Sequence, residues 1–328
     1  MWKFIIRRLL LGVVIIFFGA MISYAIVRSL PSSYVEKIAM ERSQQPGQKS
    51  YAEQVAELNA IYGLDVDIIS GFLRWGSSAL KGDWGDSWVF TIPVTQKYSN
   101  VIWYSVVLNI LTLFTQLFLC IPLGILAARK QYSKTDYAIT VFALACISLP
   151  TFFLATILKY IFAIQLGWVD LYGMVGRFYN QLTAWGKFWD MAAHLILPVL
   201  TLTMLNLGGL MRFTRTNMLE VLNADYIRTA RAKGLPERRV INQHAFRNTL
   251  IPLITYMSYL IPNLFSGSLI TETLFQIPGI GWTAYQSMVS GDIPFAMFYL
   301  VFMFVLTQVS IMLADILYAV VDPRVRVN

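Results

Sequence analysis

Residue patterns that would support catalysis are missing from this 328-residue sequence. It has no G-x-x-x-x-G-K-[ST] loop for nucleotide phosphates, no H-E-x-x-H metal motif and no G-x-S-x-G nucleophile motif. Its two histidines, His194 and His244, lie in different parts of the chain, and Cys120 and Cys146 both lie in apolar runs. We therefore expect no catalytic residue, no bound cofactor, no metal site and no disulfide framework.

The polar chemistry is concentrated in one long basic stretch, residues 223–252, between two apolar runs. Asn223 is expected to cap a short helix over residues 224–233, because its side-chain oxygen can accept from free backbone N–H groups. Gly234 follows at a position where a left-handed residue would end that helix. Pro236 suits the first turn of a second helix. The stretch is therefore predicted to be two short helices separated by a sharp break.

Residues 223–252 contain several small side chains and a specific sequence pattern. Three alanines of the first helix would let the surface of another protein approach closely; they are Ala224, Ala230 and Ala232. The pattern Ala230-x-x-x-Gly234 resembles the cytoplasmic coupling motif of ABC-importer permeases. The longer run from Asp225 to Leu235, with His244 and Arg247-Asn248 after it, resembles the peptide/nickel branch. One departure is Arg228-Thr229-Ala230, where the general motif opens Glu-Ala-Ala.

The resemblance implies that a coupling segment within residues 217–247 docks in a groove of an ATP-hydrolysing subunit. The residues expected to make this contact are Ala224, Asp225, Tyr226, Arg228, Thr229, Ala230, Arg231, Ala232, Lys233, Gly234 and Leu235. An ordinary positively charged loop on the cytoplasmic side of a membrane is the alternative interpretation.

Composition places the elements that would carry this segment in a membrane. Hydrophobic residues make up 57% of the chain and charged residues 13%, against about 25% charged in soluble domains. The first apolar run, Leu9 to Val27, is longer than the core of a signal peptide and is expected to be a retained span. Further charge-free runs are Val101–Ala128, Tyr137–Leu158, Met191–Met211, Asn248–Thr271 and Ile293–Ala314. Because about 20 apolar residues cross a bilayer, six transmembrane helices are predicted.

Charge asymmetry predicts the orientation. Basic residues gather in the N-terminal segment, the turn at 129–134, the loop at 212–247 and the C-terminal end. With six spans, all four segments lie on one side, which the positive-inside rule makes cytoplasmic. Both termini are then cytoplasmic, and residues 31–98, which are rich in Asp and Glu, are exterior. Since the basic residues flank the membrane instead of covering one face of a domain, no nucleic acid is expected.

The exterior segment, residues 31–98, contains a second string with a resemblance. Residues 43–50 are expected to form a loop, and Tyr51 to Tyr62 a helix with Val55, Leu58 and Ile61 on one side. The string Gly82-Asp83-Trp84-Gly85-Asp86-Ser87 is a glycine-paired turn that resembles a signature of peptide-type permeases. The resemblance implies a contact with an exterior solute-binding protein through Asp83, Trp84 and Asp86. Residues 267–281 and Asp322-Pro323-Arg324-Val325-Arg326 also match family strings.

Polar residues inside the apolar runs are the candidates for a solute path. Asn109, Gln116, Asn206 and Asn263 must each find a partner, and helix packing is favoured over a place on the path. Glu272 either faces water at the outer interface or lies on the path. His194, at the outer end of a span, is expected to be a satisfied polar residue. The candidates for the path or its gate are Asn206, Asn263, Ser266 and Glu272.

The expected fold is all-α, a polytopic protein with six transmembrane helices of the type I ABC importer kind. Residues 1–30 would hold the first span, residues 31–98 a sizeable exterior loop, and residues 99–328 the five-helix core. The resemblance implies a bacterial or archaeal cytoplasmic membrane, a second homologous permease, two ATPase subunits that carry ATP and Mg, and an exterior binding protein. It also implies transport of oligopeptides or dipeptides, with nickel or oligosaccharides as alternatives.

From another class, an ion-coupled secondary transporter would carry carboxylates near mid-membrane and an inverted repeat. The sequence displays neither, because the central stretches lack Asp and Glu and no repeat is evident. An intramembrane hydrolase lacks a nucleophile and base in a suitable pattern.

Overall fold

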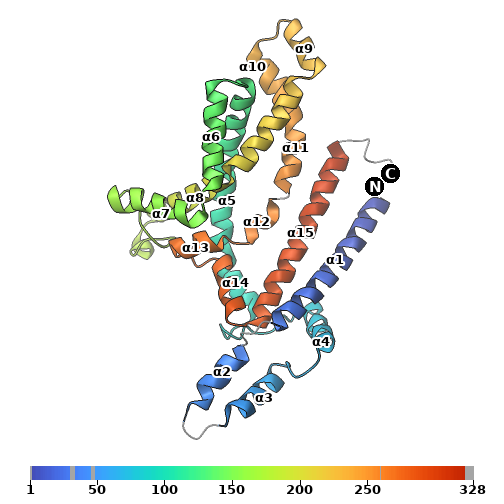
Figure 1. Cartoon of the computed structure of the whole chain (residues 1–328), viewed down its shortest axis with the longest axis vertical. Helices are drawn as coiled ribbons and strands as arrows, with labels where there is room; N and C mark the ends of the chain where they lie inside the picture. The colour runs from blue at the N-terminus through green and yellow to red at the C-terminus, as the bar shows by residue number, and fades with distance from the viewer. Residues whose placement is uncertain (1, 30–33, 46–48, 259, 322–328) are drawn as a thin grey trace. The chain divides into compact units, whose positions relative to one another are not determined.

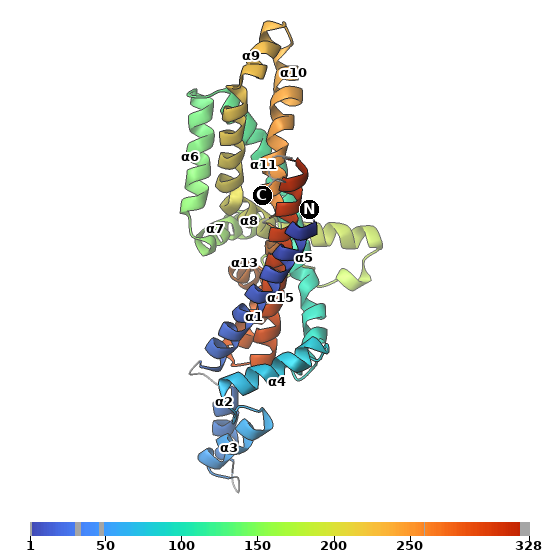
Figure 2. The same cartoon turned by 90° about the vertical axis from the view of Figure 1, so that its right-hand side faces the viewer.

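The computed structural model describes residues 2–29, 34–45, 49–258 and 260–321, and within these the chain is built from helices. Figure 1 labels the helices, and Figure 2 gives the view at a right angle. Only an isolated bridge between Asp86 and Pro93 departs from this pattern in the described part. The all-α prediction is therefore confirmed. The C-terminal string that begins at Asp322 and part of the loop predicted at 43–50 lie outside the described residues.

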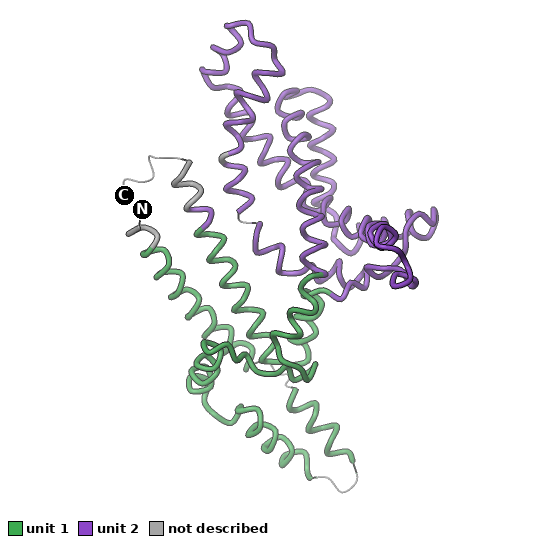
Figure 3. The backbone as a smooth tube through the Cα atoms, turned by 180° about the vertical axis from the view of Figure 1, so that it is seen from behind, with its two compact units in different colours: residues 1–103, 279–312 green, residues 104–278, 313–328 purple. Residues whose placement is uncertain are grey.

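The chain divides into two compact units, shown in different colours in Figure 3. The first unit comprises residues 1–103 and 279–312, and the second comprises residues 104–278 and 313–328. Two long helices, α5 (Val94–Arg129) and α15 (Ile293–Val321), contribute to both units.

The first unit also contains α1 (Trp2–Arg28), α2 (Tyr34–Ser43), α3 (Tyr51–Ile61), α4 (Ile68–Leu80) and α14 (Ile280–Val289). Helices α1 and α15 lie side by side in Figures 1 and 2, where a Cβ atom added to Gly19 would meet the ring of Phe304 at 3.3 Å. The core joins α1, α4 and α15 through Tyr24, Phe72 and Met297. The described part of residues 31–98 thus contains three complete helices, α2, α3 and α4.

Helix α3 follows its predicted bounds closely. It begins with a capping box, in which the Ser50 hydroxyl accepts from the N–H of Glu53 and the Glu53 carboxylate accepts from the N–H of Ser50. Of the three apolar residues predicted on one side, Leu58 is buried and Val55 partly buried in one cluster, whereas Ile61, the last residue of the helix, is 66% exposed.

The second unit contains α6 (Lys134–Ser148), α7 (Thr151–Leu158), a π-helical segment (Lys159–Gln165), a short 3-10 turn (Tyr179–Gln181) and α8 (Ala184–Leu222). It continues with α9 (Asp225–Ala232), α10 (Glu237–Arg239), a second π-helical segment (Val240–Phe246), α11 (Arg247–Ser258), α12 (Ile261–Phe265) and α13 (Leu269–Phe275). Helix α6 packs closely on α8, because Gly208 of α8 offers no side chain against Ile147 of α6.

In the described part of the chain, four helices are long and apolar enough to cross a membrane: α1, α5, α8 and α15. Two bent pairs raise this number to six if each pair is one span. The predicted span at 137–158 is not one helix, since α6 and α7 meet at 106° where Pro150 cannot continue α6. The predicted span at 248–271 is also broken, with a bend of 48° near Gly267, whose φ is +74°.

Candidate functional site

A cavity of about 480 Å³ lies within the second unit. Its polar lining includes Asn109, Thr112, Gln116, Asn206, Asn263 and Ser266. As the described residues define it, the lining contains no Asp, Glu, Lys, Arg or His. The cavity is therefore uncharged, and its wall combines polar and apolar side chains.

Helical spacing brings these side chains to the cavity. Asn109, Thr112 and Gln116 of α5 are three and four residues apart and share one face of the helix. Asn206 and Gly209 of α8 share a face for the same reason. The four amides in the apolar runs, for which helix packing was the favoured role, thus line a single cavity and three of them also bond to backbone carbonyls.

Asn109 of α5 is hydrogen-bonded to the segment between α12 and α13, beside the cavity. Its Nδ2 atom donates to the carbonyl oxygens of Asn263 (3.0 Å) and Leu264 (3.3 Å), and its Oδ1 atom accepts from the hydroxyl of Ser268 at 3.2 Å. These bonds fasten the break between α12 and α13 to α5. Gly267 allows the break, because a glycine adopts its left-handed backbone at φ +74° without steric cost.

Glu272 does not face water, one of its two predicted roles, because it is fully buried; it is also not among the residues that line the cavity. Its Oε1 atom accepts from the Ser105 hydroxyl at 2.7 Å and from the N–H of Ser268 at 2.9 Å. The carboxylate thus stabilises the first turn of α13, where unpaired N–H groups favour negative charge. At the C-terminal end of α13, Lys159 Nζ donates to the carbonyl oxygen of Leu274 at 2.7 Å.

The coupling segment has the predicted break. Gly234 has φ +76°, the left-handed conformation expected after the first helix, α9. The predicted cap is wrong: Asn223 ends the long helix α8, where its Nδ2 atom donates to the carbonyl of Leu219 at 2.9 Å. Ala224 occupies the position before α9 and makes no side-chain cap. The second helix is not short either, since α10 continues through the π-helical segment 240–246 into α11.

The residues predicted to make the coupling contact differ in how much of each is exposed. Ile227 and Ala230 are buried in a cluster with Val240, Ile241 and Ala245, so Ala230 faces the chain's own second helix. The exposed residues are Asp225, Tyr226, Arg228, Thr229, Arg231, Ala232, Lys233 and Gly234. Ala224 and Leu235 are half-buried. The small side chain of Ala230 therefore allows packing within the segment and does not lie on its outer surface.

An ion pair bridges the break at Gly234. Arg231 donates through Nη2 to Glu237 Oε1 at 2.8 Å and through Nε to Oε2 at 3.2 Å. These bonds lower the pKa of the Glu237 carboxyl and join the two helices across the turn. Both side chains are more than 40% exposed, so the pair contributes modestly to stability.

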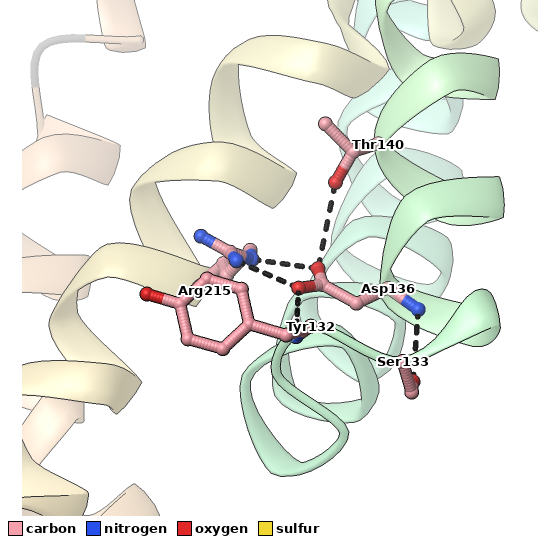
Figure 4. Close-up of polar contacts among 5 residues, drawn as sticks. All are labelled: Tyr132, Ser133, Asp136, Thr140 and Arg215. Carbon is pink, nitrogen blue, oxygen red and sulfur yellow. Dashed lines mark hydrogen bonds and ion pairs between the residues drawn. The ribbon is translucent and has the colours of Figure 1, made fainter.

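A second pair, which the sequence analysis did not single out, connects α6 to α8. Figure 4 shows Asp136 surrounded by Arg215, Thr140 and the backbone N–H of Tyr132. Arg215 lies near the end of α8 that leads into the coupling segment. The sequence does carry one signal for this pair, because Asp136 is an acidic residue among the basic residues that flank an apolar run.

The string at residues 82–87 forms the predicted glycine-paired turn, with φ +87° at Gly82 and +78° at Gly85. Asp83 and Asp86 are exposed, and Asp83 Oδ1 accepts from the N–H of Gly85 at 3.0 Å. Trp84 is half-buried and packs edge to face on Phe298 of α15. The two carboxylates are therefore accessible, whereas the indole is partly used in packing.

Asp292, just before α15, anchors this turn. The sequence analysis did not single it out. It is fully buried and accepts from the Ser87 hydroxyl and from the N–H groups of Trp88 (3.2 Å) and Phe295 (3.3 Å). Burial raises the pKa of its carboxyl above the usual range, although these hydrogen bonds oppose the shift.

His194 is a satisfied polar residue, as predicted. Its side chain is 4% exposed, its Nδ1 atom lies 2.7 Å from the carbonyl oxygen of Asp190, and its Nε2 atom lies 3.1 Å from the Asp170 carboxylate.

Comparison with known proteins gives a consistent result. The family model described as "Binding-protein-dependent transport system inner membrane component" matches residues 120–327. The chain is 34% identical to the oligopeptide transport system permease protein AppB of Bacillus subtilis (strain 168), with 99% of each chain covered. It is 33% identical to the dipeptide transport system permease protein DppB of Escherichia coli (strain K12), and 32% identical to a putative peptide transport system permease protein of Brucella abortus (strain 2308), again over 99% of each chain.

Proposed function

The chain belongs to the family of binding-protein-dependent transport system inner membrane components, and we propose that it is a permease subunit of an ATP-driven importer of oligopeptides or dipeptides. The observation that carries the substrate class is similarity over the full length to permeases named for peptides. Family membership already makes the chain a multi-pass membrane component of a transport system with other subunits.

In the proposed architecture each bent helix pair is one span, which makes six. Residues 1–30 would carry the first span, residues 31–98 a helical exterior region, and residues 99–328 the remaining core. The asymmetry of Lys and Arg supports cytoplasmic termini and a cytoplasmic segment at 217–247 in a bacterial or archaeal cytoplasmic membrane.

The proposed partners are a second homologous permease, two cytoplasmic ATPase subunits and an exterior solute-binding protein. ATP and Mg would be held by the ATPases. The exposed side of α9, with Arg228, Arg231 and Lys233, would dock on an ATPase, and Asp83 and Asp86 would meet the binding protein. The buried side of α9, through Ile227 and Ala230, would pass movement of the ATPase to α8 and α11.

The cavity in the second unit would form one wall of the solute path. Asn206, Asn263 and Ser266, the candidates for the path, line this cavity, which supports the proposal. Glu272 would act indirectly, because it holds Ser268, which lines the cavity. Closure of the ATPases would move the coupling segment and expose the path alternately to the two sides.

Purification through a tag on this chain, followed by mass spectrometry and reconstitution in liposomes, tests the proposal. We expect ATPase subunits and a second permease to co-purify, and ATP-dependent uptake of a peptide when the binding protein is added. The chain by itself should be inert. Uptake by the isolated chain under an ion gradient without ATP would instead support a secondary transporter. Preferential uptake of nickel or an oligosaccharide would replace the proposed solute.

Cysteine labelling tests the orientation separately. An impermeant reagent added to intact cells should label Ser50→Cys and should not label Lys233→Cys. Labelling of Lys233→Cys from outside would reverse the proposed topology.

A further inference from the structure

Most hydrogen-bond donors on the wall of the cavity are already used by the protein. Gln116 Nε2 donates to the carbonyl oxygen of Asn206 at 3.3 Å, and Asn206 Nδ2 donates to that of Leu202 at 2.8 Å. The hydroxyls of Thr112 and Ser268 donate to Leu108 and Asn109 in the same way. The two hydroxyls therefore have no donor left for a solute, and each amide keeps one of its two N–H groups.

The corresponding acceptors are not used. The side-chain oxygens of Gln116 and Asn206, Oε1 and Oδ1, receive no hydrogen bond from any residue in the described part of the chain. Each amide places its oxygen on the side opposite the nitrogen, so the bond to the helix backbone turns the oxygen away from that backbone. The hydroxyls on the wall keep acceptor lone pairs as well. On these four side chains, unused acceptor lone pairs thus outnumber unused donors.

The lack of charge limits what such a wall can bind. A bare metal ion would need imidazole, thiolate or carboxylate ligands, and the described lining has none of them. A carboxylate would need several donors, and of these groups only the two amides keep one N–H each. An N–H group suits an uncharged acceptor, because the two form a neutral hydrogen bond that needs no opposite charge on the wall.

We propose that Gln116 and Asn206 recognise the main-chain N–H groups of a peptide solute, so that the cavity selects by backbone and not by side chain. This inference rests on the proposed function. The two residues come from α5 and α8, and Gln116 Nε2 bonds to the backbone of Asn206 itself, which keeps the two side chains next to each other. Together they would present two acceptors to one extended segment, whose N–H groups are regularly spaced.

Methylation of the peptide nitrogen provides the probe. Trialanine and its analogue with both peptide nitrogens methylated differ in their N–H donors and not in charge. The binding protein is loaded to saturation with one peptide or the other before it is added to the reconstituted complex. Because the same loaded protein serves every permease variant, its own preference cancels when the ratio of the two initial uptake rates is compared between variants.

The wild-type complex is expected to transport trialanine faster than the methylated analogue. Asn206→Leu and Gln116→Leu should each reduce this ratio roughly 2- to 10-fold, the factor that one net hydrogen bond carries. Asn217→Leu is the matched control, since Asn217 lies on the same helix, makes the same bond to the carbonyl four residues earlier and is not in the lining. Its ratio should equal that of the wild type.

Asn206→Asp keeps an acceptor oxygen and should preserve the ratio, which separates the loss of an acceptor from a general disturbance of the site. An unchanged ratio in both leucine variants, or its loss in Asn206→Asp, would overturn the inference while leaving the proposed function intact. If the wild-type complex failed to take up trialanine with ATP, the proposed function would fall, and this inference with it.

Discussion

The guanidinium of Arg215 donates two hydrogen bonds, each 2.8 Å long, to the two carboxylate oxygens of Asp136. Asp136 is almost completely buried in the first turn of α6, and Arg215 lies 79 residues later on α8. The fork of an arginine matches a carboxylate in this geometry, and the pair fastens α6 to the end of α8 that carries the coupling segment.

Replacement of one member of this ion pair should lower the free energy of unfolding more than replacement of both members. Asp136→Leu leaves the Arg215 charge without its carboxylate, and we expect a loss of roughly 3 kcal/mol, the low end for buried pairs because Arg215 is partly exposed. The double variant Asp136→Leu/Arg215→Met should recover part of this loss. Thermal unfolding of the purified protein measures both. Equal instability of the single and double variants would contradict this account.

Gly234→Val should uncouple ATP hydrolysis from transport. Valine resists the left-handed backbone at φ +76°, at a cost of order 1–2 kcal/mol, so the turn after α9 would change and re-aim its exposed basic residues. Gly167→Val is the control, because Gly167 is also left-handed, at φ +62°, and a side chain there would meet no atom within 4 Å. Uptake, ATPase activity and membrane abundance are measured together. Normal uptake by Gly234→Val would return the segment to the status of a basic loop.

Two alanines of α9 should respond differently to a phenylalanine. Ala230→Phe forces a large side chain into the buried cluster with Val240 and Ile241, so it should destabilise the segment itself and raise its sensitivity to protease. Ala232→Phe changes an exposed position and should leave protease sensitivity unchanged while it weakens the contact with the ATPase. Co-purification of the ATPase measures that contact. If Ala232→Phe retains both the ATPase and full uptake, the exposed side of α9 is not the docking surface.

Gly208→Ala should destabilise the contact between α6 and α8. A Cβ atom at this position would collide with Ile147 and would lie 3.0 Å from the carbonyl oxygen of Ala143, so overpacking of about 1–3 kcal/mol is expected. Gly209→Ala is the adjacent control, since its Cβ atom would lie 3.5 Å from the Tyr256 hydroxyl, an ordinary contact. Thermal unfolding of the two variants should differ, and similar midpoints would show that α6 can shift.

The anchor at Asp292 should give the exterior turn a pH dependence. Because burial raises the carboxyl's pKa in the folded protein, the folded state binds the proton more tightly than the unfolded state. Its stabilising contribution is therefore complete below the ordinary value, about 3.9, and is lost as the pH rises through the raised pKa. Proteolysis at residues 86–93 should accordingly increase with pH in this window.

Asp292→Asn should remove that increase, since the amide does not titrate. Asp67→Asn, at an exposed helix N-cap, is the control and should keep it. The same pH profile in the Asp292→Asn variant and the wild type would exclude Asp292 as its source.

Several features of the candidate site were predictable because they depend on local residue chemistry. The left-handed turn at Gly234 follows from a glycine after a helix and a proline two residues on. The glycine-paired turn at Gly82 and Gly85 follows from the same property of glycine. The cap assigned to Asn223 failed because α8 continues past its apolar run, and a helix end outside that run leaves no periodic pattern to mark it.

By itself, the sequence determined that the chain is helical, that it carries apolar runs long enough to span a bilayer and that a basic segment with a break lies between two of them. Length, composition and local spacing are sufficient for these features. Only the tertiary structure decided that Glu272 is buried and hydrogen-bonded to Ser105 and that Ala230 lies in a buried cluster. It also decided that Gln116 and Asn206 line one cavity. Those relationships join residues far apart in the chain, and helix packing, which local periodicity does not encode, brings them together.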